Sequence, residues 1–294
     1  MYVVAGATGR TGRVVADSLL QQGKAVTVIV RSADKGREWQ AKGAEVAVGV
    51  LEDTPTVQST LAGAEGAYLL IPPDHTAMNF LEDRRRINDS LANAVARSGI
   101  PHVVFLSSIG AHLASGTGLV LNLHEAEAAL GVSARNLTLV RAGYSLENWV
   151  PVLGAARENG VLPSFLTSAR RVPMLATRDA GRVASWSLLE PARGRRVIEL
   201  AGPEEYSPED IARAVGSVLQ RSVRVNELPL SAAAPAFRGF GFSEDASRLF
   251  AEMIDSFNSG RIVWEGKGCE FKRGAIRPAE VFGPLLQGNW ATVG

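Results

Sequence analysis

The chain has 294 residues, 46% of them hydrophobic, and its 31 basic and 30 acidic residues give a formal net charge of +1. This length suits one large domain or a domain with a smaller lobe, and the near-neutral charge argues against a nucleic-acid-binding protein or one held at a membrane surface. The one cysteine, Cys269, excludes an internal disulfide and suits a reducing compartment. No uncharged apolar run approaches the length of a membrane span, and the first expected strand leaves no room for a signal peptide. We therefore expect a cytoplasmic protein.

The first twelve residues predict a strand, a glycine-rich loop and the start of a helix. A short apolar run, Tyr2–Ala5, meets glycines at positions 6, 9 and 12, and an apolar pattern with helical spacing follows. In a dinucleotide-binding unit the first glycine allows the tight turn, the second lets the backbone approach the phosphates, and the third lets the helix pack on the strand. The N–H groups and positive end of the helix then face the anion. The expected phosphate contacts are Gly6, Thr8, Gly9, Arg10, Thr11 and Gly12; the alternative is an ordinary turn between a strand and a helix.

Strand and helix patterns alternate through the first two thirds of the chain. The strand patterns are mostly continuous apolar runs, which is typical of strands covered on both faces in a parallel sheet. Expected strands lie at residues 1–5, 25–30, 44–48, 67–71, 102–107, 137–141 and 196–200, and expected helices at 13–22, 56–62, 77–98, 119–130 and 180–189. This alternation predicts an α/β fold of the Rossmann type, a doubly wound, mostly parallel sheet.

After about residue 142 the pattern is less regular. Ser207-Pro208 predicts an N-cap followed by proline at the first helical position, and this helix runs to Leu219. Further helices are expected at 243–259 and 278–286, with a connection at 223–242. We expect residues 1–145 to form the nucleotide-binding core, with strands returning from about 172–176 and 196–200. Residues 146–294 would form most of a smaller C-terminal α/β substrate lobe.

Arg31 at the end of the second expected strand indicates which cofactor is bound. An NAD-binding unit usually has a carboxylate there for the ribose 2′-hydroxyl, whereas a guanidinium pairs with a 2′-phosphate. Lys35 and Arg37 follow closely. We expect NADP(H), although Asp34 is also near enough to bind a ribose.

Loops after the next strands are expected to border the rest of the cofactor, because ligands in such sheets bind beyond the carboxyl ends of the strands. Leu51 follows the third strand and should lie by the adenine. Ile71 and Pro72 follow the fourth strand, and Ser107 and Ser108 end the fifth. We place these four residues beside the nicotinamide; ordinary loop positions are the alternative.

The catalytic motif common in short-chain dehydrogenases, Tyr-x-x-x-Lys, is absent, and no lysine lies between positions 43 and 266. A proton for any reduction must then come from another group or from solvent. The candidate is His124, on the helix after the fifth strand, with Glu127 one turn on to orient it and raise its pKa. A half-exposed helix histidine is the alternative. Tyr144, a second catalytic candidate or a core aromatic, and Asn148 and Trp149 are expected to shape the substrate pocket.

Other chemistries find little support in the sequence. The four histidines lack metal-ligand spacing, so no metal site is expected, and neither a nucleophile elbow nor a Walker lysine is present. The basic run at 84–86 is expected on a solvated helix face, with a subunit contact as the alternative.

Several motifs together resemble the NmrA-like family of atypical short-chain dehydrogenases. They are Gly-Ala-Thr-Gly-Arg-Thr-Gly at 6–12, Val-Arg-Ser at 30–32, Leu-Leu-Ile-Pro-Pro at 69–73, Leu-Ser-Ser-Ile-Gly-Ala at 106–111, His-Glu-Ala-Glu at 124–127 and Val-Arg-Ala-Gly-Tyr-Ser-Leu-Glu-Asn-Trp at 140–149. The resemblance implies that the glycine loop and Arg31 hold NADP, that Pro72 and Ser107 border the nicotinamide, and that His124 faces the substrate.

The family includes NADPH-dependent quinone and dye reductases and also NADP(H) sensors that regulate partner proteins. We therefore expect an oxidoreductase that reduces a small electron-poor acceptor such as a quinone. The alternative is a redox sensor with little turnover. An isomerase or epimerase would need the absent tyrosine base. A homodimer or a regulatory protein partner is compatible with either reading.

Overall fold

The structure is a computed structural model that describes residues 1–288. Its centre is a sheet of eight strands in the order β12-β10-β6-β5-β4-β1-β2-β3, with every neighbouring pair parallel. From β1 the chain first winds outward through β2 and β3, then crosses back to β4 and winds the other way. The strands are β1 (Tyr2–Ala5), β2 (Val26–Val30), β3 (Glu45–Val48), β4 (Gly66–Leu69), β5 (Val103–Ser108), β6 (Leu137–Ala142), β10 (Arg195–Ala201) and β12 (Glu270–Arg273).

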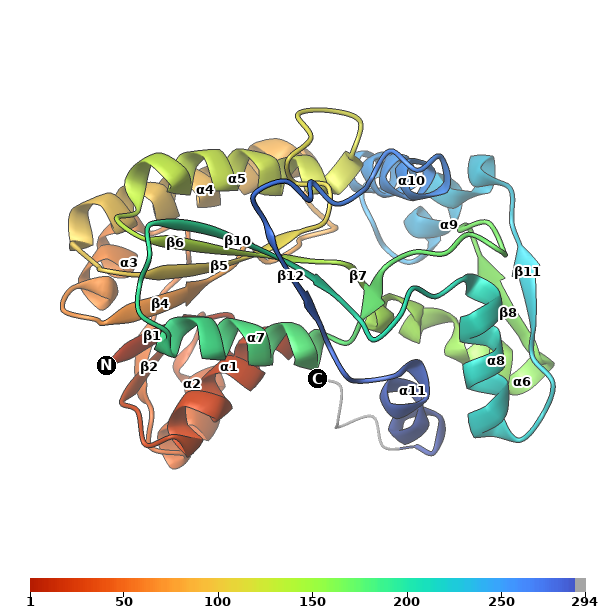
Figure 1. Ribbon diagram of the computed structural model, residues 1–294, viewed down its shortest axis with the longest axis horizontal. Helices are drawn as coiled ribbons and strands as arrows, with labels where there is room; N and C mark the ends of the chain where they lie inside the picture. Colours follow the sequence, from red (N-terminus) through yellow and green to blue (C-terminus); the bar gives the residue numbers. More distant parts are fainter. Residues whose placement is uncertain (289–294) are drawn as a thin grey trace.

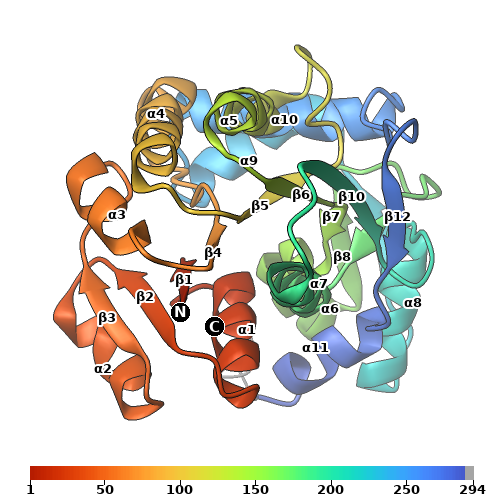
Figure 2. The same ribbon diagram turned by 60° about the vertical axis from the view of Figure 1, so that its left-hand side comes forward.

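Helices cover both faces of this sheet (Figures 1 and 2). Side chains alternate along each strand, so Val3 and Ala5 pack in the core beneath α3, α4 and α5, while Tyr2 and Val4 pack in the core beneath α1, α2 and α7. Two buried faces explain why the strands read as continuous apolar runs. The helices are α1 (Arg10–Gln21), α2 (Ala33–Ala41), α3 (Thr54–Leu61), α4 (Phe80–Ser98), α5 (Leu121–Ser133) and α7 (Thr177–Leu189).

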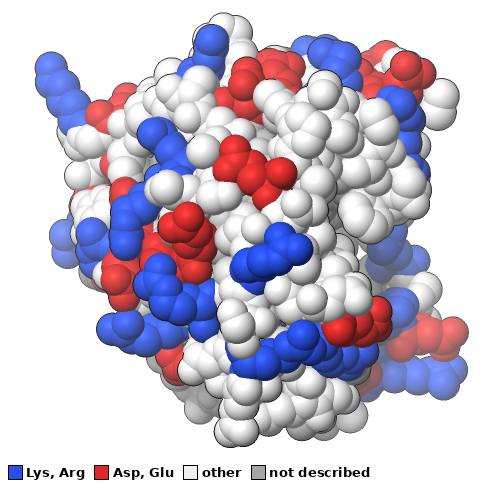
Figure 3. Space-filling view, turned by 90° about the vertical axis from the view of Figure 1, so that its right-hand side faces the viewer, with Lys and Arg blue, Asp and Glu red and all other residues white. Residues whose placement is uncertain are grey.

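The later part of the chain forms a smaller lobe beside the carboxyl ends of the central strands (Figure 1). It has its own hydrophobic core, and two short sheets pair β7 with β9 and β8 with β11. Its elements are β7 (Tyr144–Ser145), α6 (Leu153–Asn159), β8 (Val161–Ser164), β9 (Met174–Leu175), α8 (Pro208–Leu219), β11 (Arg224–Glu227), α9 (Ala233–Gly239), α10 (Glu244–Asn258), α11 (Pro278–Leu286) and the 3₁₀ turns η1 (Gly118–Val120), η2 (Leu146–Val152) and η3 (Leu230–Ala232). Figure 3 shows basic and acidic side chains interspersed over the face of this lobe, as the small net charge suggests.

The predicted fold class is confirmed, and so is the capped helix after Ser207, whose hydroxyl accepts a hydrogen bond from the Asp210 N–H (3.2 Å). Other expectations were wrong. Met174–Leu175 does not return to the large sheet but pairs with β7, and β12 joins that sheet unexpectedly. The stretch 223–242 is not a plain connection, because it contains β11 and α9. Pairing with a distant strand decides the placement of β9, β12 and β11.

No helix within residues 1–288 combines the length and the apolar composition needed to cross a membrane.

Candidate functional site

The carboxyl ends of β1 and β4 mark the point where the strand order reverses, and this is the ligand-binding position expected of such a sheet. The glycine loop after β1 lies directly against the loop after β4. A Cβ atom added to Gly6 would stand 2.7 Å from the Leu70 side chain. The two loops therefore form one continuous rim.

The glycine loop has the geometry that the sequence predicted. Gly6 has a φ of +65°, which favours glycine, and a Cβ on Gly12 would lie 2.3 Å from the Gly6 carbonyl oxygen. At Gly9 an added Cβ would meet only that same oxygen, at 3.4 Å. Gly9 is the N-cap of α1, and no side chain within residues 1–288 caps the helix there. An exposed backbone at an uncapped helix start fits a bound phosphate.

Thr8 and Arg10 are exposed on this loop, whereas Thr11 is held inward. The hydroxyl of Tyr68, buried in β4, donates to Thr11 Oγ1 at 2.8 Å. Burial raises the pKa of Tyr68, so it stays a neutral donor. This bond fixes the start of α1 against the sheet. Because Thr11 Oγ1 accepts it, the Thr11 hydroxyl hydrogen and the Thr11 backbone N–H are left to offer a ligand.

Arg31 lies exposed at the end of β2, and in the described part of the chain it forms no ion pair. Asp34, the alternative ribose ligand, binds Arg37 at 2.8 Å. Lys35 is exposed nearby. A cation left unpaired here fits a 2′-phosphate better than a ribose hydroxyl.

Of the residues expected beside the adenine and the nicotinamide, Leu51 and Ile71 are both buried, with 9% and 8% of their surfaces exposed. Pro72 is held by Arg84, whose Nη1 donates to the Pro72 carbonyl oxygen at 2.6 Å. The expectation that Arg84 lies on a solvated face is wrong, because its side chain is buried on the face of α4 that carries Ile87. Helical spacing places these two residues on one side, a signal present in the sequence.

The two serines at the end of β5 point in opposite directions, as neighbours on a strand do. Ser107 is buried and donates to Glu127 Oε1 at 2.6 Å. The same carboxylate takes two hydrogen bonds from Arg141, at 2.8 and 2.6 Å. The Ser107 side chain thus belongs to a buried ionic network beneath α5, which leaves its backbone as the part available to a nicotinamide. Ser108 instead lines a cavity described below.

His124 lies half-buried on α5, and its Nδ1 donates to the Ala111 carbonyl oxygen at 2.8 Å. A carbonyl only accepts, so Nδ1 carries the proton and Nε2 is the nitrogen left to exchange one. The expectation that Glu127 orients His124 is wrong. Glu127 binds Arg141 instead, since a buried carboxylate pairs with the strongest donor within reach.

Tyr144 is half-buried, and its ring meets Phe257 edge to face at a centroid distance of 5.4 Å. Burial, partly opposed by a hydrogen bond with Asn148, raises the pKa of Tyr144 to about 12. The phenol thus stays protonated near neutral pH and can donate a hydrogen bond but not act as a base. Asn148 itself is exposed, while Trp149 is buried in the lobe core with its Nε1 directed at Met174 Sδ (3.4 Å). Trp149 therefore belongs to the core of the smaller lobe and does not face the pocket directly.

A cavity of about 230 Å³ lies beyond the ends of β4 and β5, between the Pro72 loop, α4, α5 and α10. Asn122 and Leu123 line it, but His124 does not. Most of its wall is apolar, from Ile71, Pro72, Pro73, Phe80, Leu119, Val120, Leu123 and Met253, and its polar residues are His75, Arg84, Ser108 and Asn122. We call it the acceptor cavity.

His75, which follows the two prolines of the same loop, is a cavity residue that was not expected from the sequence. Its ring stacks on Phe242 at 4.2 Å, burial lowers its pKa, and its Nδ1 is buried without a partner within residues 1–288. The backbone of this loop is bound to the start of α10. Ser243 N–H donates to the His75 carbonyl (2.8 Å), and Ser243 Oγ donates to the Ala77 carbonyl (2.7 Å). The smaller lobe thus fixes the loop that forms one wall of the cavity.

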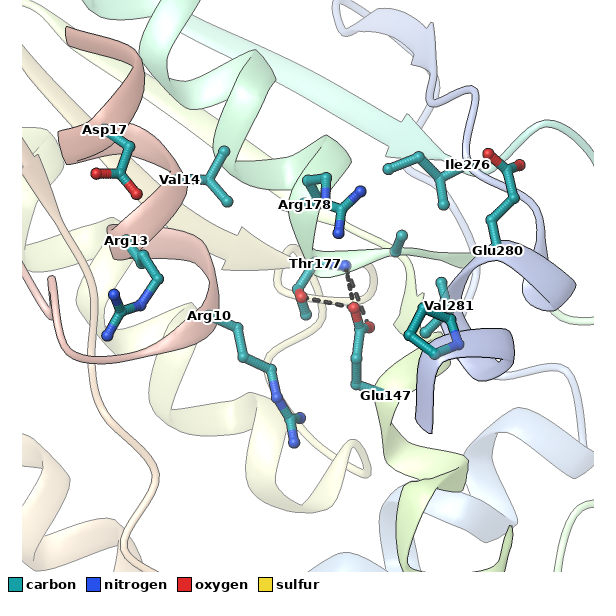
Figure 4. Close-up of a pocket in the computed structure, with 12 residues that line it drawn as sticks. Arg10, Arg13, Val14, Asp17, Glu147, Thr177, Arg178, Ile276, Glu280 and Val281 are labelled. Carbon is teal, nitrogen blue, oxygen red and sulfur yellow. Dashed lines mark hydrogen bonds between the residues drawn. The ribbon is translucent and has the colours of Figure 1, made fainter. Parts of the chain in front are cut away.

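A second cavity of about 210 Å³ opens on the other side of the glycine loop, between the starts of α1 and α7 and the helix α11 (Figure 4). Arg10, Arg13 and Arg178 contribute cations to its lining. Glu147 closes one end, where it accepts hydrogen bonds from the Thr177 N–H (2.9 Å) and Oγ1 (2.6 Å) and so caps α7. Arg10, which follows Gly9 directly, lies both in this lining and at the end of the glycine loop.

Within residues 1–288 no group of three or more His, Cys, Asp or Glu side chains is arranged to hold a metal ion.

Known proteins resemble this chain in sequence and in fold. Residues 2–261 match the model of the NmrA-like family. The chain is 28% identical to an NAD(P)H azoreductase of Xenophilus azovorans over 254 residues, 86% of each protein. It is 26% identical to quinone oxidoreductase 2 of Escherichia coli (strain K12) over 271 residues, 91% of each. Among solved structures, an NADPH-dependent quinone oxidoreductase from Escherichia coli, complexed with NADPH, superposes with a TM-score of 0.82 at 23% identity, covering 97% of this chain and 99% of that one.

Proposed function

The chain belongs to the NmrA-like family, and we propose from its site that it is an NADPH-dependent oxidoreductase that reduces a small, flat, electron-poor acceptor such as a quinone. The main observation behind the proposal is that the loops after β1 and β4 form one continuous rim. At one end lies an open glycine loop at an uncapped helix start, and at the other an apolar cavity large enough for a single aromatic ring system. Relatives named as azo and quinone reductases support the same class of reaction.

The residues at the phosphate end bind and orient the cofactor. The backbone of the glycine loop would hold the pyrophosphate and Arg31 the 2′-phosphate, while Ile71, Pro72 and the backbone of Ser107 would border the nicotinamide. NADPH, when bound, supplies the hydride. The protein's part in the reaction is then mainly to hold donor and acceptor close together and away from water.

The acceptor takes up a hydride and one proton, so the protein or the solvent must supply the proton. We assign its relay to His124, whose Nε2 is left to exchange a proton when Nδ1 is bound to the Ala111 carbonyl. Because His124 does not line the acceptor cavity, its proton would pass to the acceptor through solvent. Tyr144, neutral near pH 7, does not line the acceptor cavity, so no step of the reaction is assigned to it. Replacing His124 with Ala should lower turnover at high pH about tenfold or more and leave NADPH affinity unchanged. An unaltered pH–rate profile would remove His124 from the mechanism.

The test of the function is NADPH consumption with menadione, a benzoquinone and an azo dye. The matched control is Gly9→Ala. The backbone of Gly9, at φ −100° and ψ 177°, suits alanine, and an added Cβ meets little of the protein. This variant should fold normally yet lose roughly tenfold or more in NADPH affinity, because the methyl group would occupy the approach to the phosphates. Equal affinity in both proteins would contradict the phosphate assignment.

The alternative is an NADP(H) sensor that regulates a protein partner. It is favoured by the absence of Tyr-x-x-x-Lys and by a cavity lining that holds neither lysine nor a carboxylic acid. Tight NADPH binding without consumption of NADPH by any acceptor in the panel would decide for the sensor.

A further inference from the structure

The acceptor cavity contains one formal charge, the guanidinium of Arg84. Only 6% of this residue is exposed. Its Nη1 donates to the Pro72 carbonyl, its Nε is buried without a hydrogen-bond partner, and its Cζ lies 5.8 Å from the centre of the Phe80 ring. Across residues 1–288 it forms no ion pair.

The two arginines that follow it behave differently. Arg85 makes a two-pronged ion pair with Glu125 on α5, at 2.9 and 2.7 Å, and Arg86 pairs with Glu82 on the exposed side of α4. Asp74, whose charge acts on the same region, is exposed and accepts hydrogen bonds from the N–H and hydroxyl of Thr76. Arg84 is therefore a buried cation. Its one hydrogen bond among the described residues, to the Pro72 carbonyl, compensates its charge only in part.

An incompletely compensated cation in an apolar wall favours an anionic ligand. Burying a charge costs free energy unless the charge is paired with an opposite one. The part of the chain that the structure describes supplies no anion to pair with Arg84, and a ligand anion would do so. The other polar residues of the wall, His75, Ser108 and Asn122, contribute no formal charge to it. Asn122 donates through Nδ2 to the Leu119 carbonyl at 2.5 Å, which leaves its buried Oδ1 as an acceptor without a partner. The wall thus offers one cation and one neutral acceptor.

We propose that Arg84 makes the acceptor cavity selective for acceptors that carry an organic acid group, a carboxylate or a sulfonate, on a flat aromatic ring. The acid group binds the guanidinium, and a hydroxyl or amino group beside it can donate to Asn122 Oδ1. This inference rests on the proposed function, because it takes the cavity as the place where the acceptor binds.

The test compares two acceptors with the same naphthoquinone ring, menadione and a naphthoquinone sulfonate. For Arg84→Gln, kcat/KM for the sulfonate should fall about 10- to 100-fold further than kcat/KM for menadione, since one charge-assisted contact is lost. Arg84→Lys keeps the charge and should keep most of the selectivity. The matched control Arg86→Gln, on the exposed side of the same helix, should change neither value and should leave NADPH affinity unchanged.

A binding measurement separates this inference from the proposed function. Calorimetry with naphthalene sulfonate and with naphthol, on protein saturated with NADP⁺, needs no turnover. The wild-type protein should bind the sulfonate more tightly, with an affinity that falls as salt rises, and Arg84→Gln should abolish the difference. If neither quinone is reduced, the proposed function is wrong, but this binding comparison still decides the role of Arg84.

The inference is overturned if Arg84→Gln lowers kcat/KM for both acceptors equally. It is also overturned if the wild-type protein binds the sulfonate and the naphthol alike at low salt. Arg84 would then serve only to hold the Pro72 carbonyl. The comparison of sulfonate and naphthol binding at low and high salt uses the wild-type protein alone. It therefore tests the inference even if an Arg84 variant fails to fold.

Discussion

The two ends of the rim are built in different ways. The phosphate end consists of backbone, shaped by three glycines within residues 6–12. The acceptor cavity consists of side chains that range from Ile71 to Met253 and come from the Pro72 loop, the end of β5, the turn η1 and the helices α4, α5 and α10. Backbone geometry is set by a short local sequence, whereas a cavity wall depends on how distant segments pack. The phosphate end should therefore tolerate almost no change of side-chain size, and the cavity should respond to changes in charge and in the contacts that hold its walls.

The largest expected effect is that of Gly12→Ala. Its Cβ would lie 2.3 Å from the Gly6 carbonyl oxygen and 2.8 Å from that of Ala5, and backbone atoms cannot move aside easily. We expect a loss of about 2 kcal/mol or more in the free energy of unfolding and no measurable NADPH binding. The control is Gly131→Ala on α5, where an added Cβ meets nothing within 4 Å and should stabilise the helix by up to about 1 kcal/mol. Denaturant unfolding and calorimetry measure both effects; a Gly12→Ala protein as stable as the wild type would refute the close packing.

The next effect concerns Arg31 at the adenosine side of the phosphate end. Arg31→Asp replaces a bidentate partner of the 2′-phosphate with a like charge and should lower the preference for NADPH over NADH about 100-fold. Arg37→Ala is the control, since Arg37 is already paired with Asp34. The ratio of the two dissociation constants measures the preference. An unchanged ratio would mean that Arg31 does not contact the cofactor.

A smaller effect is expected where the two lobes hold the cavity wall. Ser243→Ala removes the hydrogen bond to the Ala77 carbonyl and the cap on the Ala246 N–H (3.0 Å). Ser207→Ala removes a comparable cap on α8, away from the Pro72 loop. Each should cost about 1 kcal/mol of stability, but only Ser243→Ala should raise KM for the acceptor, by several-fold. Equal KM values in the two variants would show that the loop keeps its position without this contact.

The smallest effect is a dependence of stability on pH. Burial lowers the pKa of His75, so the unfolded chain, with a histidine pKa near about 6.5, binds the proton more readily than the folded one. Stability is then undiminished above that pH and falls as the pH drops through it. His75→Phe keeps a ring against Phe242 and should lose less stability between about pH 7 and 5, by at most about 1.4 kcal/mol per pH unit. His102, whose pKa burial also lowers, is present in both proteins, so the difference between their unfolding curves reports His75 alone; parallel curves would contradict the shift.

The sequence predicted the parts of this protein that depend on neighbouring residues. Gly6, Gly9 and Gly12 could be assigned because their tasks follow from local backbone geometry. The seven expected strands could be found because most of them are buried on both faces and therefore form short, mostly apolar runs. Ser207 could be assigned as a cap because a cap acts within one helical turn.

Contacts between distant segments could not be predicted in this way. The sequence suggested that Glu127 serves His124, but tertiary structure placed Arg141 of β6 beside that carboxylate. It suggested a solvated Arg84, but this side chain is buried and binds the Pro72 carbonyl oxygen.

The amino-acid sequence by itself determined the doubly wound sheet, the glycine loop and the position of Arg31 at a strand end. Hydrophobic periodicity, glycine spacing and strand ends are features of a few neighbouring residues. Only the tertiary structure decided which polar side chains are buried together. That choice depends on which donor and acceptor meet once the helices have packed, and a buried charge binds the strongest partner within reach, however distant it is along the chain.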